Sequence, residues 1–150
     1  MLDSATSSGG KAGTMPSSKF VFTLQPLLDR RVALESAALQ TAAIARRADA
    51  LARRELAQLD SAIRAAGASP MPNVRLLQLL DRAAEAQARA VADGFAALEI
   101  AQRECVSAST ARKIIETLKD RRLAAFRSER RRAERSELDD ANRRKPGPLS

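Results

Sequence analysis

Residues 67–73, Gly-Ala-Ser-Pro-Met-Pro-Asn, are the only strong break between two long stretches of this 150-residue chain. The remaining glycine and proline residues lie near the two ends, apart from Pro26 and Gly94. Proline removes a backbone donor and glycine costs a helix on the order of 1 kcal/mol, so both stretches are free to be helical. A loop of about six residues between helices favours antiparallel neighbours. The sequence therefore predicts an all-α fold, a two-helix antiparallel coiled-coil hairpin.

The two helices are predicted to be unequal in length. We expect the first helix over about residues 23–66, the loop over 67–72 and the second helix over about 73–141. At about 1.5 Å per residue, the helices would be roughly 64 and 100 Å long, so the second outreaches the first beyond about residue 116. Residues 1–18 are rich in Ser, Thr, Gly and Ala, and we expect a disordered leader there and a flexible tail over 143–150.

Specific residues are placed to begin, end and shape these helices. Thr23 and Asn73 are candidate N-caps, and Pro26 is tolerable in a first turn whose amides lack intrahelical partners. Gly67 suits the left-handed position just past a helix end. Gly94, inside the second helix, is interpreted as the closest approach of the two helices, with a hinge as the alternative.

The apolar residues of the second helix repeat every seven positions, which is typical of a left-handed coiled coil. The predicted coiled-coil core of this helix is Leu77, Leu80, Ala84, Val91, Leu98, Cys105 and Ile115. Arg112 and Lys119 interrupt the repeat. The stripe expected in the first helix, with a one-residue slip after Ala43, is Leu24, Leu28, Val32, Leu39, Ala43, Ala48, Ala52, Leu56, Leu59, Ile63 and Ala66.

The composition argues against an enzyme. The chain has no His and a single Cys, so it lacks the usual general base and cannot form an internal disulfide or a multi-thiolate metal site. We therefore expect no catalytic residue, no cofactor and no metal, and interpret Cys105 as a small buried hydrophobic residue. No apolar run reaches 18 residues and no signal sequence opens the chain, so we expect a cytoplasmic protein without membrane insertion.

Positive charge is concentrated toward one end of the chain. The formal net charge is +8, and the segment 112–135 holds ten Lys or Arg against four acidic residues. Three interpretations remain open: a solvated helix face, a docking surface for an acidic protein, and nucleic-acid binding. The last is disfavoured, because in zipper-type DNA readers the basic region precedes the zipper and because the chain has no Tyr or Trp for stacking.

Both ends of the expected coiled coil resemble one known family. Residues 20–31 follow the pattern Phe-x-Phe-x-Leu-Gln-Pro-Leu-Leu-Asp-x-Arg, which resembles the opening of the FliJ family of the bacterial flagellar type III export apparatus. Residues 118–123, Leu-Lys-Asp-Arg-Arg-Leu, and 137–141, Glu-Leu-Asp-Asp-Ala, resemble the family's closing helix. The resemblance spans about residues 20–141. The extra leader, the Ala-rich first helix and the Arg-biased run 127–135 depart from the family's pattern.

The resemblance implies a coiled coil similar to the central shaft of the rotary ATP synthase, whose paired ends enter the pore of the hexameric export ATPase. It also implies contact with the membrane export gate and with export chaperones of late flagellar substrates, at a cytoplasmic position peripheral to the inner membrane at the flagellar base. The candidate ATPase-ring residues are Leu24, Leu27, Leu28, Arg121, Arg122, Phe126 and Arg131. The alternatives are the equivalent stalk of a virulence type III secretion system and a basic helical nucleic-acid-associated protein. Neighbouring genes would separate the two secretion systems, and retention on nucleic acid at about 0.2 M salt would favour the third.

Overall fold

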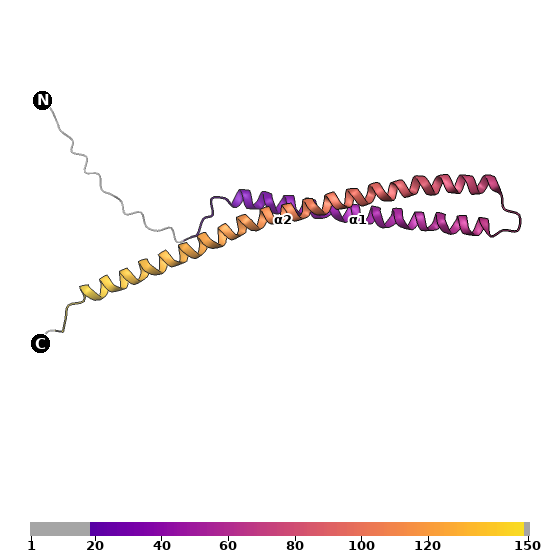
Figure 1. Cartoon of the computed structure of the whole chain (residues 1–150). Helices are drawn as coiled ribbons and strands as arrows, with labels where there is room; N and C mark the ends of the chain where they lie inside the picture. Colours follow the sequence, from indigo (N-terminus) through magenta and orange to yellow (C-terminus); the bar gives the residue numbers. More distant parts are fainter. Residues whose placement is uncertain (1–18, 149–150) are drawn as a thin grey trace, which may run out of the picture. The chain divides into compact units, whose positions relative to one another are not determined.

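The computed structural model describes residues 19–148 and contains two helices, with no strand in that range. Helix α1 spans Gln25–Gly67 (43 residues) and helix α2 spans Val74–Arg144 (71 residues). The two helices run antiparallel on either side of a short loop (Figure 1). The predicted all-α hairpin with a longer second helix is therefore confirmed. Helix α2 continues past the predicted end at residue 141, and the predicted leader lies outside the described residues.

The chain divides into two compact units, which we describe separately. The hairpin unit, Leu24–Thr117, contains all of α1, the loop and the first part of α2. The terminal unit contains, among the described residues, residues 19–23 and 118–148. The hairpin unit ends at Thr117 of α2. This is close to residue 116, beyond which the sequence predicts that the second helix has no first-helix residue opposite it.

Helix α2 begins with the side-chain cap that the sequence predicts. The Leu76 amide donates to Asn73 Oδ1 at 3.2 Å, which satisfies one of the first-turn donors. The expected cap of α1 by Thr23 is wrong, because Leu24 occupies the N-cap position without a side-chain hydrogen bond. Pro26 does lie in the first turn of α1, where its missing amide has no cost.

Helix α1 ends without the expected left-handed glycine. Gly67 is the last helical residue, and no glycine in the described part of the chain has positive φ. Ala68 closes the helix in right-handed conformation, and its amide donates to the Arg64 carbonyl at 3.1 Å. The prediction for Gly67 was wrong because a helix can end in this geometry with any residue at that position.

In the hairpin unit the seam between the helices follows one heptad on each helix. With Leu28 and Leu77 as position a of a heptad abcdefg, every a and d position of this unit is buried or half-buried and every f position is exposed. The Cys105 thiol, at an a position, lies against α1 and donates to the Ala38 carbonyl at 3.1 Å. All seven predicted core residues of α2 lie in this seam: Leu77, Leu80, Ala84, Val91, Leu98, Cys105 and Ile115.

The stripe predicted for the first part of α1 is wrong. Val32 and Leu39 are 46% and 54% exposed, and Ala48 is exposed as well. The heptad of α1 instead continues without a slip through Leu28, Arg31, Glu35, Ala38, Ala42, Ala45, Asp49, Ala52, Leu56, Leu59, Ile63 and Ala66. Three of these small or polar seam residues contact groups on α2: Glu35 pairs with Arg112, and the Ala38 and Ala52 carbonyls accept hydrogen bonds from Cys105 and Gln87. The periodicity of one helix cannot reveal such partners.

Polar contacts fill the seam where α1 is least apolar. Arg112, expected to interrupt the repeat, occupies an a position and forms ion pairs with Glu35 of α1 and with Glu116 one turn along α2. The hydrogen bonds that Arg112 donates to Glu35 and Glu116 raise the pKa of Arg112. Gln87 Nε2 donates to the Ala52 carbonyl at 3.0 Å. These contacts tie the two helices together in one register.

Gly94 does not mark a tight crossing. A Cβ atom built at Gly94 would meet only Asp49 Oδ1, at 4.0 Å, which is ordinary van der Waals contact. The most deeply buried seam residues are Ala42 and Ala101, 1% and 4% exposed. Asp49 is 9% exposed, and its Oδ2 accepts from Arg53 Nε at 3.0 Å, the i, i+4 pair that the spacing predicts.

Candidate functional site

An aromatic pair joins the two chain segments of the terminal unit. The rings of Phe20 and Phe126 have centroids 5.6 Å apart and planes tilted by 55°. Tilted rings at this separation place the positive edge of one near the negative face of the other, which is a preferred aromatic geometry. The pair therefore packs residues 19–23, which precede α1, against α2.

A cation–π contact stands beside this pair. The Cζ atom of Arg122 lies 5.7 Å from the ring centroid of Phe22, within the range at which a guanidinium is attracted to a ring face. Arg122 Nη1 also donates to Thr23 Oγ1 at 3.4 Å. Phe22 is only 6% exposed, whereas Arg122 is exposed, so the guanidinium covers a buried ring from the solvent side. We call Phe20, Phe22, Thr23, Arg122 and Phe126 the aromatic–arginine cluster.

Local sequence explains how this cluster forms. Phe20 and Phe22 lie in a non-helical segment just before α1, while Arg122 and Phe126 are four residues apart in α2. Residues at i and i+4 of a helix project from the same side, so one face of α2 presents both partners. The cluster needs the two Phe residues ahead of α1 and the i, i+4 pair together.

The rest of this part of α2 presents positive charge that the described residues do not neutralise. Arg130 Nε pairs with Glu134 Oε1 at 3.4 Å, one turn along the helix. Seven further arginines in the unit are exposed and form no ion pair with the described residues: Arg121, Arg127, Arg131, Arg132, Arg135, Arg143 and Arg144. Unpaired guanidinium groups on an exposed helix are suited to carboxylates of another protein.

The structure brings together some of the predicted site residues and separates others. Arg122 and Phe126 belong to the cluster, and Arg121 and Arg131 are exposed on the same helix. The three predicted leucines are assigned to the hairpin unit: Leu24, Leu27 and Leu28. Leu28 is 6% exposed, so it serves the hairpin seam.

Sequence reasoning did not include Phe20 and Phe22 among the site residues. The available signal was that two of only four Phe residues lie within three positions just before the first helix. Aromatic residues are costly to leave in water, so such a concentration just before a helix indicates a packing contact.

The described part of the chain offers neither a metal site nor a membrane-spanning stretch. Among residues 19–148, no group of three or more His, Cys, Asp and Glu side chains is arranged to hold a metal ion. Neither described helix contains a stretch long and apolar enough to cross a membrane. Comparison of the chain with protein-family models, curated proteins and solved structures finds no match.

Proposed function

We propose that this protein is a non-enzymatic coiled-coil stalk of the bacterial flagellar type III export apparatus. It would bind the hexameric export ATPase, promote assembly or activity of the ring, and link it to the membrane export gate and to substrate chaperones. Its place would be the cytoplasmic side of the inner membrane at the flagellar base. The resemblance of residues 20–31, 118–123 and 137–141 to the FliJ family is the basis of the proposal.

The observation that carries the proposal is the aromatic–arginine cluster. It joins the opening motif, through Phe20 and Phe22, to the closing motif and the turn after it, through Arg122 and Phe126. The first residues of the opening motif and the closing motif are about a hundred positions apart in the chain, yet they pack in one unit that also carries exposed arginines. Apolar packing beside exposed positive charge is consistent with a surface that binds an acidic protein.

The mechanism would be binding linkage. A stalk that binds the assembled hexamer more tightly than free subunits shifts the equilibrium toward the hexamer, by an amount set by the difference between the two affinities. No chemistry is required of the stalk, since ATP hydrolysis belongs to the ring. Charge attraction would also speed the encounter with an acidic surface and weaken as salt increases.

The test is stimulation of the cognate export ATPase by purified chain. Charge reversal at three arginines, Arg121→Glu, Arg122→Glu and Arg131→Glu, should abolish stimulation while the helical circular dichroism signal stays intact. Unchanged stimulation would remove the basic segment of α2 from the mechanism. Arg122→Lys keeps the charge and should retain most of the stimulation, which separates electrostatic from purely structural effects.

A matched control is available in the hairpin unit. Arg54, Arg82 and Arg103 are exposed and form no ion pair with the described residues. Their reversal to Glu changes the net charge by the same amount, so this variant should stimulate the ATPase like the unaltered chain. Equal loss in both triple variants would mean that only net charge matters.

A further inference from the structure

Each helix of the hairpin unit carries a second run of apolar residues beside the seam that joins the two. These residues occupy positions g and c of the heptad, spaced alternately three and four residues apart. In α1 they are Leu34, Ala37, Thr41, Ile44, Ala48 and Leu51, bounded by Arg30 on one side and by Glu55 and Gln58 on the other. In α2 they are Leu76, Leu79, Ala83, Ala86, Ala90, Ala97, Ile100, Ser107, Ala111 and Ile114, with Asp93 and Glu104 at the two remaining positions.

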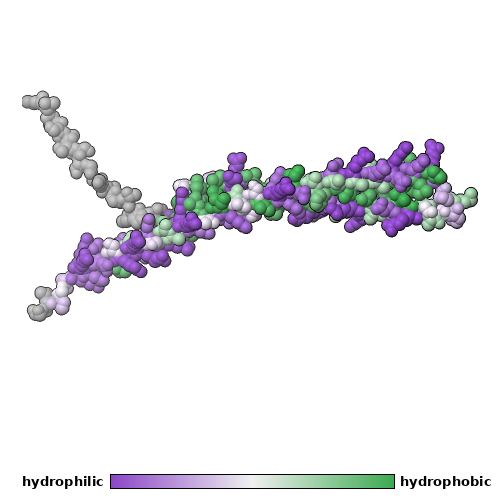
Figure 2. Space-filling view, viewed as in Figure 1, coloured by the Kyte–Doolittle hydropathy of each residue, from purple (hydrophilic) through white to green (hydrophobic). Residues whose placement is uncertain are grey.

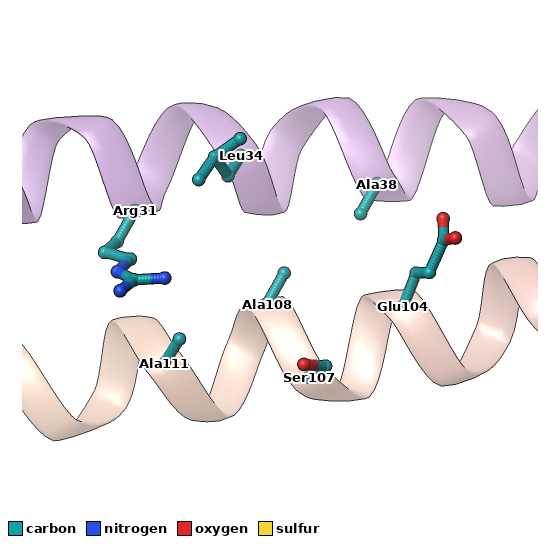
Figure 3. Close-up of a pocket in the computed structure, with 7 residues that line it drawn as sticks. All are labelled: Arg31, Leu34, Ala38, Glu104, Ser107, Ala108 and Ala111. Atoms are coloured by element: carbon teal, nitrogen blue, oxygen red, sulfur yellow. The ribbon is translucent and has the colours of Figure 1, made fainter.

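Both runs lie on one face of the hairpin. In an antiparallel helix pair, position g of one helix faces position g of the other, so the two g and c runs are neighbours across the seam. Leu34 of α1 and Ala111 of α2, both at g, line one groove (Figure 3). This groove has a volume of about 300 Å³, and its full lining is Arg31, Leu34, Ala38, Glu104, Ser107, Ala108 and Ala111. We call this side of the hairpin the g/c face.

The g/c face leaves large aliphatic side chains in solvent along the hairpin. Seven of them are 45% to 66% exposed: Leu34, Ile44, Leu51, Leu76, Leu79, Ile100 and Ile114. Half-exposed aliphatic side chains gathered on one face and bordered by charged residues are typical of an interaction surface. Hydrophobic surface along the hairpin is visible in Figure 2.

Arginines flank this face on its outer edges. Position f borders the g and c run on the side away from the seam, and in the hairpin unit no acidic residue occupies position f. Six arginines are found there: Arg47, Arg54, Arg75, Arg82, Arg89 and Arg103. All six are exposed, and none forms an ion pair with the described residues. We call these six residues the arginine rim.

We propose that the g/c face binds an acidic amphipathic helix of a partner protein. The partner's apolar residues would lie in the groove between α1 and α2, and its carboxylates would pair with the arginine rim. Alanine at nine of the 24 g and c positions of the hairpin unit lets a third helix approach closely, and the heptad spacing of these positions matches that of another helix. This surface belongs to the hairpin unit and does not depend on the proposed ATPase contact.

Two other occupants fit the same face less well. A second copy of the hairpin would place one arginine rim against another, and like charges across an interface oppose binding. A membrane surface would favour aromatic and leucine side chains on a convex apolar face, whereas the g/c face has no aromatic residue and contains a groove.

Binding of two synthetic peptides to the full chain tests the proposal. Both peptides have about four heptads with Leu at a and d, and they carry either Glu or Lys at e and g. Fluorescence anisotropy at low salt should give a dissociation constant at least about tenfold lower for the Glu peptide than for the Lys peptide. Equal affinities, or no binding of either peptide, would overturn the proposal.

Three variants locate the binding surface. Ile44→Glu combined with Ile100→Glu should weaken Glu-peptide binding at least about tenfold, because it places charge in the apolar face. Val106→Glu, at an exposed b position on another side of α2, should leave binding unchanged. Loss of binding in the Val106 variant alone would place the surface elsewhere and overturn the proposal.

Reversal of the rim gives the sharpest readout. The variant with Arg54, Arg82 and Arg103 replaced by Glu should prefer the Lys peptide over the Glu peptide, which loss of folding cannot produce. The terminal-unit variant with Arg121, Arg122 and Arg131 replaced by Glu should bind the Glu peptide normally, so failure of this proposal and failure of the proposed function are distinguishable.

Two measurements on the full chain test the other occupants. Sedimentation equilibrium should show no dimer of the unaltered chain that is lost in the Ile44→Glu and Ile100→Glu variant. In flotation experiments the chain should not bind vesicles of phosphatidylglycerol and phosphatidylcholine. A dimer with that sensitivity would assign the face to a second copy. Flotation with that sensitivity would assign it to anionic lipid, and either result would overturn the proposal.

Discussion

Replacement of Gly94 by Ala should stabilise this protein. Gly94 lies in the interior of α2 at a seam position, and a methyl group there would meet only Asp49 Oδ1, at 4.0 Å. Ala is favoured over Gly in a helix interior by about 0.8 to 1.0 kcal/mol, and no steric penalty offsets the gain at this distance. For a domain of this size the change corresponds to an increase in Tm of about 3 to 6 °C.

The measurement is thermal and urea unfolding of the full chain, followed by far-ultraviolet circular dichroism. Gly67→Ala is the matched control, because Gly67 is the last residue of α1 and has no atom within 4 Å of an added Cβ. At a helix end the propensity difference is only partly expressed, so the control should gain no more than a few tenths of a kcal/mol. Both variants should be compared at two protein concentrations, since association would make Tm concentration-dependent.

A loss of stability in Gly94→Ala would refute this reasoning. It would mean that the helices approach more closely at Gly94 than the 4.0 Å contact with Asp49 allows, as the sequence alone suggested. The double variant with Asp49→Ala would locate the cause. If the loss disappears when Asp49 is shortened, the two side chains compete for the same space, and the two effects will not be additive.

Two further predictions concern local contacts of the hairpin. Asn73→Ala should lower the free energy of unfolding by about 1 kcal/mol in urea titrations, because Leu76 loses its capping acceptor, whereas Thr23→Ala should show no capping loss. Arg112→Met should lower the urea midpoint, because it leaves Glu35 and Glu116 without their shared partner. Because the pKa of Arg112 is raised, its contribution to the free energy of unfolding is complete below the ordinary arginine pKa and is lost only as the pH rises through the raised value. The deficit of the Met variant should therefore be the same at about pH 6 and about pH 9. A deficit that disappears at the higher pH would contradict the assignment.

The candidate site was only partly predictable. Arg122 and Phe126 were predicted from a resemblance in short motifs, which gives no information about the contacts of their side chains. That Phe22 packs under Arg122, and that Phe20 meets Phe126, depends on where the segment before α1 returns to α2. Such contacts between residues about a hundred positions apart leave no periodic signal in a single sequence.

The two helices, the loop between them, the cap at Asn73 and the seam of α2 could all be predicted from the amino-acid sequence. These features follow from local chemistry: where glycine and proline stand, and which residues repeat every seven positions in an apolar helix. The side of α1 that faces α2 depends instead on contacts between the two helices. Glu35 is unsuited to a helix interface until Arg112, 77 residues away, lies against it, and the pairing leaves more apolar side chains such as Leu39 in solvent. The free energy of a seam belongs to both helices together, so the hydrophobicity of one of them could not identify it.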